Sequence, residues 1–539
     1  MTEETTLNKI FYTLLGLMAV GLFAISYDVG FYYDDVQQII QNPAIRNLFD
    51  FNAILNDPFR PGRVFTNISL TLNWTISKAN PWSYHLFNVL FHTLNTGLLF
   101  VFLKRIGVTN TLLRMFSGWL FFCHPLMVEG VSYVMGRTEL LKTLVTMVLL
   151  LLYLRTPRPK FLIYVILIFS LLVKETCGLI PFLFIALDLT VGRLKWRELP
   201  VREHLFYLSH GLWMLLWWQF LDFEGMHGNL VGFNLYPFWD YALTNLAYLC
   251  FTLKLILVPT NTSIIHEWPL EIPWVMTIAG GILLVLCLTF ALRKRHQHPL
   301  EAFWIVFFFV SYLPNSSVLQ FINPYSEYRL YQTVMPFSFG LALLIFIACK
   351  RTKLALSIAT IVLVFYMCLH VLYVKLWHGP VDVWLNAQEL YPHSIQVNTV
   401  LSHEYKSYGF CRSALKYMQL GCQRNNQEPL LDLHCAVAQG LLQFRLKDFE
   451  QGRQSFLAIR RLLPLAPQKL VAKRGMVFSP TNMLSMYTML LSMAHQLNDQ
   501  VAYQELLAEA RQRKIPGMET FDVTTLPKAE ACRAEDVSQ

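Results

Sequence analysis

Long apolar runs separated by short basic segments dominate the first 378 residues. Runs such as FYTLLGLMAVGLFAISY, GGILLVLCLTFAL and LALSIATIVLVFYMCLHVLYV contain no Asp, Glu, Lys or Arg. An apolar stretch of about 20 residues can cross a bilayer as an α-helix. Backbone groups in lipid must pair with each other, which leaves only helices or closed barrels. The pattern therefore predicts an all-α, polytopic membrane domain over residues 1–378.

The basic segments predict how this domain is oriented. Because Lys and Arg collect in cytoplasmic loops, we expect the first helix to run outward and to be uncleaved, since MTEETTLNK lacks the features of a signal peptide. About eleven spans keep the basic segments inside. The stretch 240–258 breaks the alternation, so we expect it to re-enter the membrane or to lie along its outer face. The expected spans are the first helix and the segments near 86–103, 111–128, 139–154, 161–174, 176–191, 205–221, 274–292, 301–319, 331–349 and 354–376.

Beyond the last apolar run the sequence becomes charged and amphipathic. EYKSYGFCRSALKYM and QFRLKDFEQGRQSF align with Ala414 over Gly452, and MAHQLNDQVAYQELLAEA is a weaker third copy. This offset is close to the tetratricopeptide period of about 34 residues. We expect tetratricopeptide-like repeats over 379–527, with unrelated helical hairpins as the alternative, and a polar, frayed tail over 528–539. Such arrays present a concave surface to a protein partner.

Composition supports a membrane protein. The chain is 55% hydrophobic and 15% charged, whereas soluble domains are about a quarter charged. The net charge of +9 comes largely from the short basic loops, so we predict no nucleic-acid partner. The ten cysteines are scattered without a CxxC pair, which predicts neither a disulfide framework nor a metal site.

The most informative polar feature is the adjacent pair Asp34 and Asp35 in GFYYDDVQQII. Two carboxylates at a membrane edge are costly unless water, a cation or a reaction needs them. An Asp beside a sugar donor can deprotonate an acceptor hydroxyl as a general base. The alternative is a helix N-cap, which accounts for one Asp but not for two. The pair begins a long outward segment, Gly30 to Tyr84, that we expect to be a functional loop.

Further charged side chains are expected on the same outer side. Arg offers a fork of donors to phosphate oxygens, and ionisable groups at membrane depth are candidate functional groups. The further candidate site residues are Arg60, Arg63, His92, His124, Glu129, Arg137, Glu139, Lys174, Glu175, Lys254, Glu327 and Arg329.

Each group also has a structural alternative. Arg60, Arg63 and Lys254 can snorkel to the interface, and His85, Asn88 and His92 share a helix face that can pack against other helices. The other two alternatives are a bridge from Arg137 to a carboxylate such as Glu139, and mutual pairing of Lys174 with Glu175. The sequons at Asn67 and Asn73 arise often by chance and carry little weight.

Acids and cations on one membrane face fit a reaction between a lipid-linked, phosphate-bearing substrate and a hydroxyl outside the cytoplasm. The cations would stabilise charge on the leaving phosphate, and the lipid tail would enter sideways from the bilayer. A transporter is an alternative, although its spans would repeat visibly. A non-catalytic scaffold is another, and it leaves the Asp pair unexplained. No cofactor follows from the sequence, and a divalent cation at the acid pair stays open.

Six motifs occur in the order typical of one family: DD, FRPGRVFTNISLTLNW, YHLFNVLFH, HPLMVEGVSYVMGRTELL, LVKET and SEYRLY. They resemble the GT-C glycosyltransferases that carry tetratricopeptide repeats, which include transmembrane O-mannosyltransferases and bacterial relatives. The resemblance implies a GT-C fold, a polyprenyl-phosphate-linked sugar donor and inverting transfer to a hydroxyl. We expect the acceptor to be a protein, with a lipid or cell-surface glycan as the alternative.

The resemblance also implies roles for the candidate residues. Asp34 or Asp35 matches the catalytic acidic motif, whose carboxylate would act as general base, and the cations and acids named above bind the donor at a periplasmic or lumenal face. Two positions depart from the family: Tyr328 separates Glu327 from Arg329, and Met127 stands where the family has a second His. We expect a multi-pass protein of a bacterial inner membrane with its site and repeats in the periplasm, and the endoplasmic reticulum membrane is the alternative.

Overall fold

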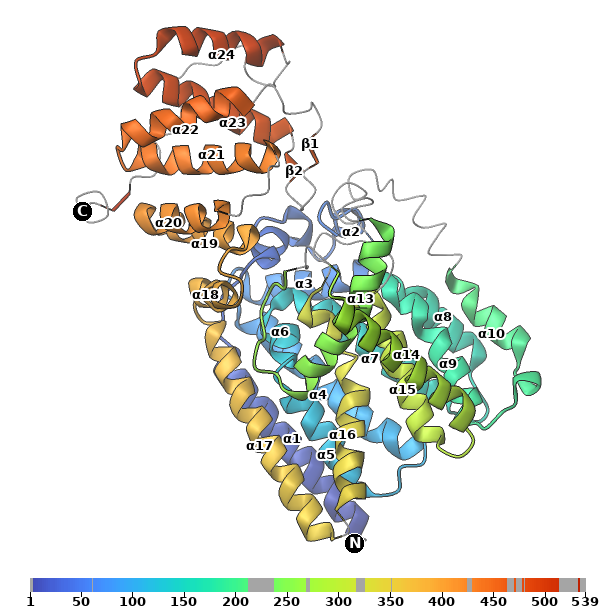
Figure 1. The fold of residues 1–539 in the computed structure, drawn as a ribbon. Coiled ribbons are helices and arrows are strands. Elements are labelled where there is room, and N and C mark those ends of the chain that lie inside the picture. The colour runs from blue at the N-terminus through green and yellow to red at the C-terminus, as the bar shows by residue number, and fades with distance from the viewer. Residues whose placement is uncertain are drawn as a thin grey trace.

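The computed structural model is a bundle of helices that carries a stack of helical hairpins at one end (Figure 1). Within the described residues, the strands are β1 (Leu470–Val471) and β2 (Val477–Phe478), which form one antiparallel pair. The predicted all-α class is confirmed. The structure describes residues 3–60, 62–211, 237–267, 272–316, 325–349, 351–423, 429–462, 470–471, 477–478, 480–512 and 532–533.

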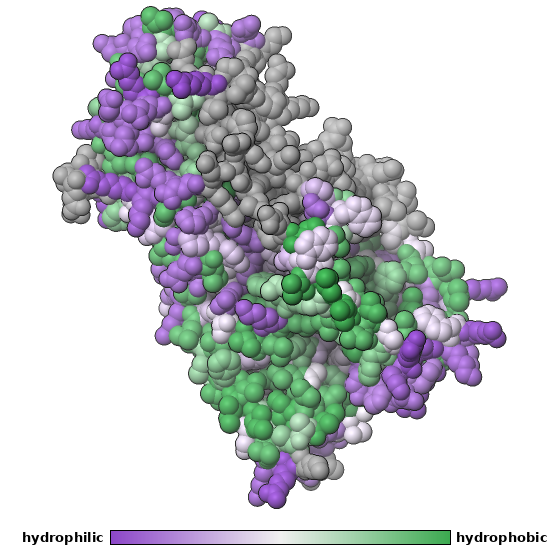
Figure 2. Space-filling view, in the orientation of Figure 1, coloured by the Kyte–Doolittle hydropathy of each residue, from purple (hydrophilic) through white to green (hydrophobic). Residues whose placement is uncertain are grey.

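Several helices of the bundle suit a bilayer. Among the described residues, four are long and apolar enough to cross a membrane: α1 (Glu3–Ser26), α4 (Trp82–Arg105), α14 (Trp274–Lys294) and α17 (Thr352–Leu376). Three shorter apolar helices accompany them: α5 (Thr111–Cys123), α8 (Lys160–Ser170) and α16 (Val334–Ala348). Figure 2 shows hydrophobic residues gathered over the lower bundle and hydrophilic ones over the repeats. The predicted membrane protein is confirmed, and the number of spans stays a prediction.

Further helices complete the bundle: α7 (Arg137–Tyr153), α9 (Ile180–Leu189), α10 (Val201–Leu208), α13 (Phe238–Leu257) and α15 (Pro299–Tyr312). The expected span at 205–221 begins in α10 and then leaves the described residues. The expected re-entrant stretch is a continuous helix of 20 residues, α13, which packs along α14. Local signals set the helix starts: the Asn110 side chain accepts the Leu113 N–H at the start of α5.

The segment between Gly30 and Tyr84 is folded, so the expected long loop is wrong. It contains η1 (Val36–Ile40), η2 (Pro43–Ile45), α2 (Phe51–Leu55) and α3 (Val64–Ser77). Polar side chains of this segment cap its helices: Asn42 and Asp50 accept backbone N–H groups in the first turns of η2 and α2. The loop-like polarity of this segment therefore reflects capping of short helices.

The C-terminal region begins with α18 (Pro380–Leu390) and continues as helical hairpins. They are α19 (Ile395–Ser407) with α20 (Cys411–Cys422), α21 (Pro429–Arg445) with α22 (Phe449–Leu462), and α23 (Pro480–Gln496) with α24 (Gln500–Gln512). The aligned residues Ala414 and Gly452 lie in α20 and α22, the second helices of two hairpins. Ala414 is buried, and a Cβ on Gly452 would lie 2.8 Å from the Phe444 ring. The predicted helical repeat is confirmed, and its limits at 379 and 527 stay predictions.

Two disulfides cross-link the repeats, which overturns the expectation of no disulfide framework. Cys411 pairs with Cys532, and Cys422 pairs with Cys435. The expected frayed tail is wrong at Cys532 and Arg533, because the Arg533 N–H also donates to Gly409 O at 2.9 Å. The longer bridge joins residues 121 positions apart. Such a pairing depends on how the hairpins stack and cannot be inferred from cysteine spacing.

The segment between Gly30 and Tyr84 touches the start of the C-terminal region. The Tyr32 hydroxyl donates to His378 O at 3.0 Å, and the Tyr33 ring packs against Trp384 with centroids 5.7 Å apart. α2, α3 and α6 (Met127–Ser132) lie at the end of the bundle nearer the repeats (Figure 1). The residues around the Asp pair therefore share one end of the molecule with the repeats.

Candidate functional site

The site is built around the turn between α6 and α7, which contains η3 (Val134–Gly136). Only glycine fits at position 136, because a Cβ there would lie 2.4 Å from the Gly130 carbonyl oxygen. The close approach of the two backbones aims the N–H groups of Val134 and Met135 at the segment between Gly30 and Tyr84. The turn thus supplies backbone donors to a buried acid.

That acid is Asp35, whose side chain is fully buried. Its Oδ1 accepts the Met135 N–H at 3.0 Å, and its Oδ2 accepts the N–H groups of Val134 and Tyr32, each at 3.4 Å. Burial raises the pKa of Asp35 to about 8, against the opposing effect of these donors. Asp35 precedes η1 without a side-chain cap, so the helix-cap alternative is wrong for it. Asp35 therefore holds the segment between Gly30 and Tyr84 against the turn by hydrogen bonds.

Asp34 faces a cavity instead. The cavity has a volume of about 140 Å³. Asp34 accepts a hydrogen bond from the Tyr133 side chain, and burial raises the pKa of Asp34 although the charges of Arg60, Arg63 and Arg329 lower it. The lining residues are Asp34, Gln38, Phe59, Arg60, Arg63, Tyr133, Met135, Thr138, Lys174, Glu175, Thr176, Pro314, Tyr328 and Arg329. Tertiary structure therefore separates two acids that are adjacent in sequence.

Arg60 has the most unusual environment among the cavity cations. It is 4% exposed, and its guanidinium donates to Met135 Sδ at 3.2 Å and to Gln38 O at 3.5 Å. Among the described residues no carboxylate lies within ion-pair distance of Arg60. Burial lowers the pKa of Arg60 to about 10. A buried guanidinium with weak acceptors can gain most from an anionic ligand.

Two other cations on this side have carboxylate partners. Arg63 Nη2 lies 3.1 Å from Glu175 Oε1, and Lys174 Nζ forms an ion pair with Glu139. The alternative in which Lys174 pairs with Glu175 is therefore wrong. Glu139 also has a second partner, Lys142, whose Nζ lies 2.5 Å from Glu139 Oε2. The sequence-based prediction did not include Lys142. The available signal was the i, i+3 spacing of these two residues on a helix.

Glu129 and Glu327 lie beside the main cavity rather than in it. They line a smaller cavity of about 30 Å³. Glu327 Oε1 accepts the Ser263 N–H at 2.8 Å and lies 2.6 Å from His266 Nε2. Burial raises the pKa of Glu327, burial and the nearby Glu327 raise that of Glu129, and burial lowers that of His266 to about 3. Glu327 and His266 therefore form a buried contact, and sequence offered no signal for His266, which lies in a different segment.

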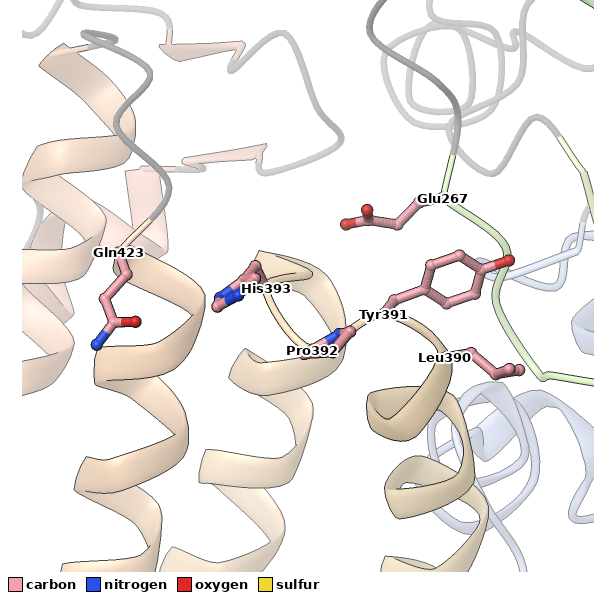
Figure 3. A pocket seen from close by; sticks show the side chains of 6 residues that line it. All are labelled: Glu267, Leu390, Tyr391, Pro392, His393 and Gln423. Carbon is pink, nitrogen blue, oxygen red and sulfur yellow. The ribbon is translucent and has the colours of Figure 1, made fainter.

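A wider groove opens where the bundle meets the repeats. It has a volume of about 460 Å³, and Figure 3 shows the Glu267 carboxylate directed over Pro392 and His393. The Tyr391 hydroxyl lies 2.8 Å from His266 Nδ1, so His266 connects this groove with Glu327. The lining residues are Glu267, Leu390, Tyr391, Pro392, His393 and Gln423.

Besides Asp35, Glu129, Glu139 and Glu327, four more predicted site residues do not line the main cavity: His92, His124, Arg137 and Lys254. His92 contacts the Tyr331 hydroxyl at 2.6 Å, His124 contacts Ile256 O at 2.8 Å, and Lys254 is exposed on α13. The packing alternative accounts for His92, as it does for His85 and Asn88, which contact Val29 O and Val131 O.

The buried Arg137 side chain connects α7 with α3 and α4 by hydrogen bonds. It donates to Asn88 Oδ1 at 2.8 Å and to Tyr84 O at 2.7 Å, and also to Asn73 Oδ1. The expected bridge from Arg137 to a carboxylate is wrong, because amide and carbonyl oxygens accept its N–H groups. The sequon asparagines Asn67 and Asn73 are both buried in α3, so neither is placed as a glycan acceptor.

Together, the fold and the site define an all-α membrane protein with a cation-rich cavity at the end that carries helical repeats. Over about a quarter of its length the chain resembles protein O-mannosyl-transferases. Protein O-mannosyl-transferase TMTC3 from Homo sapiens is 28% identical over 141 residues, which cover 24% of this chain and 15% of that protein. TMTC2 from Homo sapiens is 28% identical over 149 residues, covering 26% and 18%. Tmtc1 from Drosophila melanogaster is 27% identical over 134 residues, covering 23% and 16%.

The match thus spans less than a fifth of the length of each of these three relatives. No protein-family model matches the chain, and no solved structure matches it. In the part of the chain that the structure describes, no group of three His, Cys, Asp or Glu side chains is placed to hold a metal ion.

Proposed function

We propose that the protein is a membrane glycosyltransferase that moves a sugar from a polyprenyl-phosphate-linked donor to a hydroxyl of a protein. The observation that carries this proposal is the cavity in which Asp34 meets Arg60, Arg63, Lys174 and Arg329. The curated proteins that the chain resembles are named protein O-mannosyl-transferases, which favours mannose and a protein acceptor.

In the proposed reaction Asp34 takes the proton from the acceptor hydroxyl as its oxygen attacks the anomeric carbon. The bond from that carbon to the phosphate oxygen breaks on the opposite face, so the configuration inverts. Negative charge grows on the leaving phosphate, where Arg60, Lys174 and Arg329 would stabilise it. The raised pKa of Asp34 brings the base closer to neutral pH, where a general base acts best. Glu129 and Glu327 are proposed to shape the adjoining sugar site.

The lipid tail has a suitable place in the bundle. A groove of about 240 Å³ runs between α13, α14, α15 and α16, and apolar side chains dominate its lining, among them Leu253, Leu283, Trp304 and Phe308. An apolar groove among membrane helices suits a polyprenyl chain, because both the lipid and the lining avoid water. We propose that the tail lies here while the phosphate reaches the cavity.

The disulfides favour an outward site. Disulfides persist in the periplasm and in the lumen of the endoplasmic reticulum but are rare in the cytosol. Because the repeats contain two of them and share one end of the molecule with the Asp pair, we place both on the non-cytoplasmic side. A bacterial inner membrane with a periplasmic site is our proposal, and the endoplasmic reticulum is the alternative.

The acceptor is proposed to reach the site along the repeats. Tetratricopeptide-like repeats over 379–527 would recruit the protein, and the groove of Figure 3 lies between them and the bundle. A lipid or cell-surface glycan is the alternative acceptor. Incubating the purified protein with both acceptor types and the same labelled donor separates these two outcomes.

The direct test measures transfer of radiolabelled mannose from a polyprenyl-phosphate donor in reconstituted membranes. Wild-type protein should transfer label, and Asp34→Asn should lose about 100-fold or more of the rate, as expected when a general base is removed. The control is Arg105→Met, because Arg105 is exposed in the last turn of α4. This variant should keep full activity. Wild-type transfer rates in Asp34→Asn would rule out the proposed base.

A further inference from the structure

Three side chains behind the cavity form a buried ion triad. Glu139 sits between two lysines, with Lys174 on one carboxylate oxygen and Lys142 Nζ 2.5 Å from the other. Glu139 is 0% exposed, Lys142 is 3% exposed and Lys174 is 5% exposed. These buried charges stabilise one another, because Coulomb interactions away from water are weakly screened.

Only one member of the triad reaches the cavity. Lys174 lines it, together with Thr176 and Pro314. Lys142 lines a small void of about 10 Å³ whose walls also include Thr176 and Pro314. Lys142 therefore lies directly behind the cavity wall and touches no substrate in the proposed reaction.

We infer that Lys142 is a positioning residue that keeps the charge of Lys174 available to the phosphate. A single carboxylate paired with a single lysine is electrically neutral, so Glu139 alone would cancel the field of Lys174. With Lys142 on its other oxygen, Glu139 is already compensated, and the triad carries one net positive charge at the cavity wall. This inference rests on the proposed function, because it assumes an anionic group in the cavity.

The inference predicts opposite effects of removing the two hidden partners. Lys142→Met leaves Glu139 to neutralise Lys174, so an anion should bind more weakly. Glu139→Gln leaves two lysines without a carboxylate, so an anion should bind more tightly. In the double variant, Lys142→Met with Glu139→Gln, Lys174 keeps its charge again and binding should recover. Loss of structure alone would not produce this recovery, since the double variant removes more native contacts than either single variant.

The experiment measures the dissociation constant of farnesyl phosphate, a short polyprenyl monophosphate, with full-length protein in nanodiscs. We expect Lys142→Met to weaken binding about tenfold, Lys142→Arg to bind like wild type, and the double variant to return to within about twofold of wild type. The matched control is Arg158→Met. Arg158 lies near the other end of α7 and forms an ion pair with the buried Asp188. When Arg158 is replaced, Asp188 keeps Tyr153 and His204 as hydrogen-bond partners.

The outcomes separate the two proposals. Unchanged binding in a folded Lys142→Met protein, or no recovery in the double variant, overturns the role of Lys142 and leaves the proposed function standing. If Lys142→Met does not fold, Glu139→Gln decides, and binding equal to or weaker than wild type overturns the inference. Wild-type protein that does not bind farnesyl phosphate overturns the phosphate site itself.

Discussion

The Oδ1 atom of Asp35 accepts a hydrogen bond of 3.0 Å from the backbone N–H of Met135, 100 residues away in sequence. Because the Asp35 side chain is held by the turn between α6 and α7, its neighbour Asp34 faces the cavity. The Met135 side chain lines the same cavity and contacts Arg60. The contact between Asp35 and Met135 thus sets the positions of both the proposed base and a proposed phosphate ligand.

The pH dependence of transfer should report Asp34. Activity should rise with pH through the raised pKa of Asp34, because the base acts only when deprotonated. The charge of Arg60 lowers that pKa, so Arg60→Met should move the rising limb to higher pH by about one unit. The measurement is kcat/KM for mannose transfer across pH, with Arg105→Met as the control. A limb that stays in place in Arg60→Met contradicts the pairing of these two charges.

The pH dependence of stability should report Asp35. Its pKa is about 8 in the folded protein against an ordinary 3.8, so between these values the folded state holds a proton that the unfolded chain has released. Stability therefore falls as pH rises through this window. Asp35→Asn cannot titrate, so the melting temperature of wild type minus that of the variant should shrink from about pH 4 to about pH 8. The exposed cap variant Asp50→Asn is the control, and a constant difference for Asp35→Asn would argue against a raised pKa.

Gly136→Ala should damage both stability and transfer. A Cβ at this position would lie 2.4 Å from Gly130 O, so the two backbones must separate and the N–H groups that bind Asp35 must move. We expect a loss of about 2–4 kcal/mol in unfolding free energy, typical of a backbone clash in a buried turn. Thermal unfolding of Gly16→Ala gives the comparison, since nothing lies within 4 Å of a Cβ there. Equal melting temperatures for the two variants would refute the close approach.

Arg137→Met should lower the yield of folded protein. The change removes an N–H donor from buried oxygens of Asn73, Asn88 and Tyr84, and breaking a buried charged network costs about 3–5 kcal/mol. Size-exclusion profiles and melting temperatures in detergent measure the effect. Arg105→Met should change stability by less than about 0.5 kcal/mol. Comparable behaviour of the two variants would mean that Arg137 does not connect these helices.

The two disulfides should differ in their contribution to the repeats. The bridge between Cys411 and Cys532 closes a separation of 121 residues, and that between Cys422 and Cys435 closes one of 13. In the chain-entropy model, removing the longer loop costs about 5 kcal/mol and the shorter about 3 kcal/mol. Cys532→Ser should therefore lower the unfolding midpoint of the repeats more than Cys435→Ser does. Thiol labelling without reductant checks that both bridges form, and labelled Cys411 and Cys422 in wild type would exclude them.

The positions of the long helices and the order of the charged motifs along the chain were predictable, because both follow from local sequence patterns. Apolar runs of α1, α4, α14 and α17 mark membrane helices by length and hydropathy alone. The segment between Gly30 and Tyr84 was predicted less well, since its polar residues cap short helices that have no clear periodicity. His266 was missed because its partner Glu327 lies in a distant segment. Lys142 was missed although its i, i+3 spacing from Glu139 on one helix was an available signal.

The sequence by itself determined that this is an all-α membrane protein with helical repeats, and it predicted that acids and cations gather at one side of the helix bundle. Hydropathy and helical period are properties of neighbouring residues, so they survive without a three-dimensional context. Tertiary structure alone decided that Asp34 faces the cavity while Asp35 binds the turn. It also decided the pairings of Lys174 and of the cysteines. These depend on contacts between distant segments, where the packing of helices sets which side chains meet.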